Sequence, residues 1–123
     1  MNSFKEIASR FNLPYDSRSQ DWELEVADPS RISEFLSGFP ELDEPELKRV
    51  LTEILMASFD EAAELNQLNL QEWQRFWSFL RDDLDSYSDI IAYWVRKPEG
   101  GFWSISSQLK DSLTQDGLWH LVS

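Results

Sequence analysis

The chain has 123 residues, of which 41% are hydrophobic and 14% aromatic, and this composition excludes an intrinsically disordered protein. Its length predicts a single domain over residues 1–123. Eleven basic and 23 acidic residues give a formal net charge of −12, which disfavours direct binding to nucleic-acid phosphates or to anionic membranes. The absence of Cys excludes disulfides, thiolate metal sites and thiol nucleophiles.

Signals for export or membrane insertion are not found in the sequence. Residues 1–6 lack the apolar core of a secretory signal, and the apolar run over 90–95 is much shorter than the ~20 residues that span a bilayer. We therefore expect a cytoplasmic protein that makes no membrane contact.

The first two predicted elements are a short helix and a short strand. An apolar stripe at i, i+3, i+4 and i+7 predicts a helix over 4–11, and Pro14 ends it. Residues 22–27 alternate between apolar and polar, with Trp22, Leu24 and Val26 on one face, which is the pattern of a strand.

Two further helices are predicted in the middle of the chain. Asp28 and Pro29 form a typical helix start, and the helix that follows carries the apolar stripe Ile32, Phe35, Leu36 and Phe39. The longest helix is predicted from about 43–45 to about Leu65.

The remaining residues predict three more helical segments. Asn69 can cap a helix with a strongly aromatic stripe, which is expected to form the centre of the core. Periodicity favours a helix over 87–95 with a capping box at Ser86 and Asp89, closed by residues 96–101. A last helix carries Ile105, Leu109 and Leu113, and the apolar tail 118–122 is expected to dock on the body. The predicted fold class is therefore mainly α, a compact single-domain bundle of five or six helices with one short strand near 22–27.

Catalytic motifs are scarce. His120 is the one His and lies in the apolar tail, where it is better interpreted as a tail residue than as a general base. No Gly-rich phosphate loop and no nucleophile elbow are present. The sequence therefore predicts a protein that is not an enzyme and that has no catalytic residues, metal site or cofactor.

One carboxylate pattern offers an enzymatic alternative. Glu61 and Glu64 form an i, i+3 pair near the end of one predicted helix, and Asp82 and Asp85 form another near the end of the next. The two pairs resemble the acidic motif of the all-helical MazG-type nucleotide pyrophosphatases, and this resemblance implies magnesium-dependent nucleotide hydrolysis. The second pair has Asp where that family has Glu, and its Lys and Asn helpers are not evident. A short connection would also make the two helices antiparallel, which places the pairs at opposite ends.

Negative charge is concentrated in one part of the chain. Residues 16–64 hold 14 acidic and four basic residues, a net of −10, whereas residues 65–123 have a net of −3 and residues 1–15 a net of +1. The excess falls into two sequence groups, which are Asp21, Glu23, Glu25 and Asp28, then Glu41, Asp43, Glu44 and Glu46. An acidic residue at a helix N-terminus stabilises it by ~0.3–1 kcal/mol, but this effect does not need four of them.

Two functional interpretations follow from the charge pattern. Acidic surfaces keep small proteins soluble, and they also speed association with a basic partner. The leading hypothesis is a non-enzymatic module that binds a basic protein through residues 21–46, with Trp22 as an apolar anchor. Its most concrete form is an immunity-type inhibitor of a basic, nuclease-type toxin or other nucleic-acid-acting enzyme. A structural adaptor or scaffold subunit is a further alternative.

Overall fold

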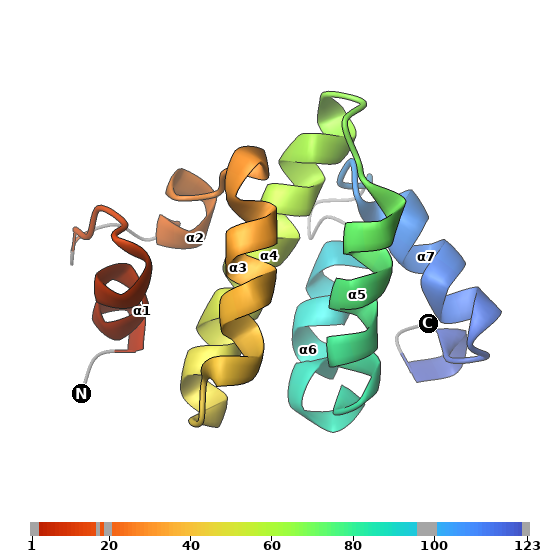
Figure 1. The fold of residues 1–123 in the computed structure, drawn as a ribbon. Helices are drawn as coiled ribbons and strands as arrows, with labels where there is room; N and C mark the ends of the chain where they lie inside the picture. Colours follow the sequence, from red (N-terminus) through yellow and green to blue (C-terminus); the bar gives the residue numbers. More distant parts are fainter. Residues whose placement is uncertain (1–2, 17, 19–20, 96–100, 122–123) are drawn as a thin grey trace. The chain divides into compact units, whose positions relative to one another are not determined.

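The computed structural model describes residues 3–16, 18, 21–95 and 101–121, and every regular element in these ranges is helical (Figure 1). The mainly-α fold class is confirmed, with seven α-helices in the described residues rather than five or six. The α-helices are α1 (Ser3–Phe11), α2 (Trp22–Glu25), α3 (Ile32–Gly38), α4 (Pro45–Glu64), α5 (Leu70–Arg81), α6 (Leu84–Val95) and α7 (Ser106–Gln115). The 3-10 turns are η1 (Pro29–Arg31), η2 (Phe39–Glu41) and η3 (Trp119–Leu121).

The chain divides into two compact units, Met1–Ser58 and Phe59–Ser123, which we call the first and second unit. The boundary falls inside α4, so this helix begins in one unit and ends in the other. The single domain expected over residues 1–123 stays a prediction.

The strand predicted over 22–27 is wrong, because this segment forms the short helix α2. Backbone N–H of Val26 donates to the carbonyl of Trp22 at 3.0 Å, and the helical turn buries these two side chains together. Leu24, expected on the same face, points outward and is 40% exposed. A helical turn satisfies the backbone locally, whereas a strand needs a partner and the described residues contain none.

The interior of the first unit is built from the predicted apolar stripes of α1, α3 and the first part of α4. Phe11 packs edge-on against Phe35, with ring centroids 5.5 Å apart. Residues 28–41, which we call the α3 segment, run antiparallel to α4. At the beginning of this segment Asp28 N–H donates to Ser58 Oγ at 3.0 Å, and near its end the Phe39 ring lies under Lys48, which comes earlier in α4. All four apolar stripe residues of the α3 segment are buried, as the sequence predicts.

The second unit has an aromatic centre. Phe59 stacks on Phe76 with a centroid distance of 5.2 Å, and Trp73 meets Phe59 edge-on at the same distance. Asn69 caps α5 as predicted, since its Oδ1 accepts from Glu72 N–H at 3.0 Å. The aromatic stripe of this helix therefore forms the core that its sequence predicts.

Helix α6 is confirmed, but it begins earlier than the sequence predicts. Its first residue is Leu84, and the carboxylate of the preceding Asp83 accepts from the Ser86 hydroxyl at 2.8 Å. Ser86 thus lies inside the first turn and Asp83 takes the position expected for the cap. The residues expected to close this helix, 96–100, lie outside the described residues.

Helices α5 and α7 of the second unit lie side by side and parallel (Figure 1). The indole N–H of Trp73 donates to Ser112 Oγ at 2.8 Å, and that of Trp77 donates to Asp116 Oδ2 at 2.6 Å. Because both partners lie 39 positions further along the chain, the two helices run in the same direction. None of the described helices is both long and apolar enough to cross a lipid bilayer.

Candidate protein-binding surface

The acidic residues predicted to form one surface fall into two groups in the structure. Figure 1 shows α2 near the beginning of the α3 segment and the α3–α4 connection at its other end, in agreement with the antiparallel contacts of the first unit. We call Asp21, Glu23 and Glu25 the α2 acidic group. We call Glu41, Asp43, Glu44 and Glu46 the 41–46 acidic segment. Residues 21–46 therefore do not present one continuous acidic face.

The 41–46 acidic segment carries its carboxylates at the surface. All four of its acidic residues are exposed, from the end of η2 through the first turn of α4. Glu46 accepts a long hydrogen bond of 3.4 Å from the Ser3 hydroxyl, whereas Glu41, Asp43 and Glu44 form no side-chain hydrogen bond or ion pair with any described residue. Three neighbouring carboxylates are thus left to solvent.

The nearby Lys48 forms no ion pair with this segment among the described residues. Lys48 follows Glu44 by one helical turn, but its ammonium lies over the Phe39 ring, 5.8 Å from the centroid. Glu44 accepts the first backbone hydrogen bonds of α4 through its carbonyl, from Leu47 at 3.1 Å and from Lys48 at 3.2 Å. Carboxylates at this end of a helix face its positive dipole, which stabilises Glu44 and Glu46 but not the two acidic residues before them.

The exposed apolar residue beside the α2 acidic group is not the one predicted. Trp22 is only 4% exposed, and its indole N–H donates to the Pro14 carbonyl at 2.7 Å. It is part of the interior of the first unit, so the prediction of Trp22 as an exposed anchor is corrected. Leu24 is the exposed apolar residue of α2 and lies between Glu23 and Glu25.

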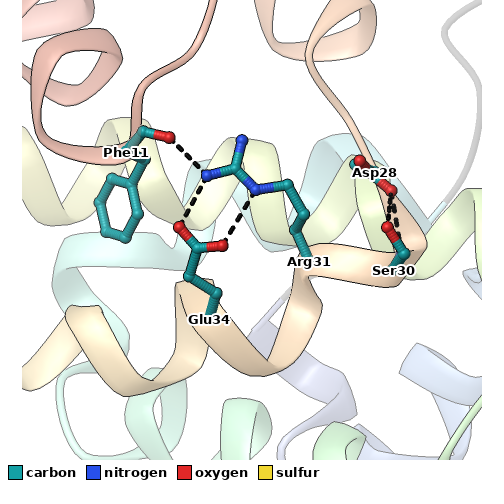
Figure 2. A network of polar contacts seen from close by, with 5 residues as sticks. All are labelled: Phe11, Asp28, Ser30, Arg31 and Glu34. Atoms are coloured by element: carbon teal, nitrogen blue, oxygen red, sulfur yellow. Dashed lines mark hydrogen bonds and ion pairs between the residues drawn. The ribbon is translucent and has the colours of Figure 1, made fainter.

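Asp28 has a structural role that accounts for its position. Its Oδ1 accepts from the backbone N–H of Ser30 at 3.0 Å and from the Ser30 hydroxyl at 2.6 Å, which caps η1 (Figure 2). The residue is half-buried. The capping predicted at this position is confirmed, and the carboxylate is already occupied within the unit.

An Arg in the same network ties two helices together (Figure 2). Arg31 binds Glu34 through two hydrogen bonds, Nη2 to Oε2 at 2.6 Å and Nε to Oε1 at 3.1 Å, and Nη2 also donates to the Phe11 carbonyl at the end of α1. The hydrogen bond from Arg31 lowers the pKa of Glu34, and the same bond raises the pKa of Arg31. This ion pair stabilises the unit and takes Glu34 out of the set of free carboxylates.

The carboxylates of the enzymatic alternative are not brought together. Glu61 and Glu64 lie at the end of α4 and precede α5, whereas Asp82 and Asp85 follow it, so a helix of about 16 Å separates the pairs. All four residues are exposed, and no group of three or more possible metal ligands occurs in the described part of the chain. Asp60, next to this pattern, accepts from Ile105 N–H at 2.9 Å. The two carboxylate pairs therefore lie at opposite ends of α5, as the short connection between α4 and α5 predicts.

A polar groove in the second unit was not predicted from the sequence. It lies between α5 and α7, has a volume of about 500 Å³, and includes the amides of Gln74, Gln108 and Gln115 in its lining. The sequence does contain a signal for this groove. Gln108 and Gln115 lie seven positions apart, beside the apolar stripe of α7, and Gln74 lies beside the aromatic stripe of α5. The parallel pairing of two helices separated by α6 could not be foreseen from spacing alone.

Comparisons with protein-family models, with curated proteins and with solved structures found no match for this chain. The geometry and charge of the molecule therefore carry the functional inference.

Proposed function

We propose that this chain is a non-enzymatic module that binds a basic protein through the 41–46 acidic segment. The observation that carries the proposal is the run of exposed carboxylates at this segment, three of which form no hydrogen bond or ion pair within the described residues. Helix stabilisation accounts for acidic residues inside the first turn of α4 but not for Glu41 and Asp43.

The electrostatics of such a segment favour fast association with a cationic surface. Four carboxylates within six residues create a local negative potential that attracts a basic partner over about one Debye length, ~8–10 Å in physiological salt. Their strongest effect is expected on the association rate, and slower association weakens binding in proportion, because exposed charges change the dissociation rate little.

The most concrete form of the proposal is an immunity-type inhibitor of a nucleic-acid-acting enzyme or toxin. Enzymes of that class hold phosphates with Lys and Arg, and closely spaced carboxylates can occupy the same cationic site. Leu24, exposed between Glu23 and Glu25, supplies an apolar contact on a second acidic group of the same unit.

The proposal is tested by capturing partners of the tagged chain from a lysate of its own source, at low and at high salt. The test variant carries Glu41→Gln, Asp43→Asn and Glu44→Gln, which removes three negative charges without placing a positive charge near a helix N-terminus. We expect the native chain to retain a stoichiometric basic protein at low salt and the test variant to retain little of it.

The matched control carries Glu61→Gln, Glu64→Gln and Asp82→Asn, which removes the same charge from the second unit. These carboxylates lie at helix C-termini, where they oppose the dipole, so their loss does not weaken the helices. The control is expected to capture the partner like the native chain. Equal capture by all three proteins would show that the 41–46 acidic segment is only a solvated surface.

A further inference from the structure

The groove between α5 and α7 has a floor whose polar groups are already paired. Trp73 and Trp77 are 0% and 5% exposed, and their indole N–H groups are bound to Ser112 and Asp116. Arg81 Nη1 lies 3.3 Å from the same Asp116 oxygen, which gives a neutral ion pair at one end of the groove. The floor is therefore part of the packing between the two helices.

The sides of the groove carry polar groups that the unit itself does not use. Gln74, Gln108 and Gln115 line the groove and form no side-chain hydrogen bond with any described residue. Asp111, between the last two on α7, is exposed and forms no ion pair within the described ranges. Because the Arg81 charge is neutralised by Asp116, Asp111 gives the groove a net charge of −1.

The dimensions and chemistry of the groove fit an extended polypeptide. From Leu70 to Arg81 the wall formed by α5 is about 16 Å long, which matches about five residues of extended chain. A Gln side chain offers both a carbonyl acceptor and an amide donor, so three of them can pair with the alternating N–H and C=O groups of a peptide backbone. The exposed Leu70 adds an apolar contact at the end where both helices begin.

Other ligand classes fit the groove less well. Both indole rings are covered, so neither offers the stacking face that a sugar ring or a nucleobase would need. A linear polyamine would match the charge of Asp111, but it has only donors and would leave the amide N–H groups of the Gln residues without acceptors.

We propose that the α5–α7 groove binds an extended peptide segment that carries a Lys or Arg, with its cation on Asp111 and its backbone on Gln74, Gln108 and Gln115. This inference rests on the proposed function in one respect, since the segment would belong to the basic partner that the 41–46 acidic segment attracts. It adds a second contact, located in the second unit, that recognises a backbone as well as a charge.

The test uses the full ¹⁵N-labelled chain and two pools of acetylated, amidated pentapeptides, one with a central Lys and one with a central Glu, uncharged elsewhere. The Lys pool is expected to shift the side-chain amide signals of the three Gln residues. Asp111→Asn should weaken this binding about fivefold, the size expected for an exposed ion pair. Asp82→Asn, an exposed carboxylate elsewhere in the unit, is the matched control and should leave binding unchanged.

Three results would overturn the proposal. Equal shifts with the Lys and Glu pools would exclude the role of Asp111, and shifts confined to other residues would exclude the groove. Equivalent shifts with spermidine alone would show a site for linear cations rather than for peptides. The variant neutralised at the 41–46 acidic segment should still bind the Lys pool, so a failure of the proposed function and a failure of this site are distinguished.

Discussion

Gly38 shows how closely the side chains of the first unit approach one another. A Cβ atom built on this residue would lie 2.6 Å from Cζ of Phe11, well inside van der Waals contact. Phe11 is itself buried and packed against Phe35, so its ring has little room to move. The absence of a side chain at the end of α3 therefore permits the contact between α1 and α3.

Replacing this glycine tests whether packing or helix propensity dominates. Gly38→Ala would gain up to ~1 kcal/mol from helix propensity, but overpacking against a buried ring costs about 1–3 kcal/mol. We expect a net loss of about 1 kcal/mol in the free energy of unfolding, measured by urea denaturation. In a Phe11→Leu background the same Gly38→Ala change should cost less, because the smaller side chain makes room for the new methyl group. A more stable Gly38→Ala protein would contradict the close approach.

The ion pair between Arg31 and Glu34 predicts a dependence of stability on pH. A carboxyl whose pKa is lowered by folding stabilises the native state above its unfolded pKa, near 4.5, and this contribution is lost as the pH falls through the lower folded pKa. Glu34 is 53% exposed, so the contribution is about 0.5 kcal/mol at neutral pH.

Glu34→Gln removes the titrating group and tests this dependence. The variant should be less stable than the native chain near pH 7, and the difference should disappear by about pH 3, as measured by urea denaturation at each pH. Glu41→Gln serves as the control, because this exposed carboxylate forms no ion pair with a described residue. A difference in the free energy of unfolding between the native chain and Glu34→Gln that persists unchanged in acid would contradict the ion pair.

At the scale of the elements, three helices end in the same way. Asn12, Asn66 and Gly117 have positive φ values of 54°, 57° and 69°. In each case the next residue donates its backbone N–H to a carbonyl five positions earlier, at 2.8 Å after α1, 2.8 Å after α4 and 2.7 Å after α7. This left-handed C-terminal cap satisfies carbonyls that the last helical turn leaves free.

The C-terminal cap at Asn66 can be made more stable by substitution, because a non-Gly residue holds the positive φ there. Asn66→Ala should lower the free energy of unfolding by about 1 kcal/mol, because Ala adopts the left-handed conformation at a higher cost than Asn does. Asn66→Gly should be at least as stable as the native chain. Gly117→Ala provides a matched comparison, since a Cβ there meets no atom within 4 Å and any loss reflects backbone strain alone. Thermal or urea unfolding that shows no loss for either Ala variant would contradict this account.

The sequence predicts the longer helices well, because their apolar stripes extend over two or more turns. The sequence misassigns Trp22–Glu25 because the segment is so short. Trp22 and Val26, four positions apart, share one face of a strand and also one face of a helix, so their pattern does not distinguish the two. The contact that buries the Trp22 indole comes from Pro14, outside that segment. The exposure of the 41–46 acidic segment follows from its composition, but its separation from the α2 acidic group depends on the antiparallel packing of α3 against α4.

At the scale of the whole molecule, the charge is more evenly divided than the sequence segments suggest. The first unit contains 12 acidic and six basic residues and the second contains 11 and five, so each has a net charge of −6. The boundary inside α4 assigns Asp60, Glu61 and Glu64 to the second unit. The clustering of unpaired carboxylates at the 41–46 acidic segment, rather than an imbalance between units, therefore distinguishes this surface.

The association rate of the purified basic partner, measured against ionic strength, tests the central claim most directly. For the native chain the rate constant should fall steeply as salt rises, because steering by exposed charges is screened. The Glu41→Gln, Asp43→Asn, Glu44→Gln variant should associate more slowly in low salt and with a shallower salt dependence, while the matched control keeps the native rates. Identical rates and slopes for the native chain and this variant would contradict binding through the 41–46 acidic segment.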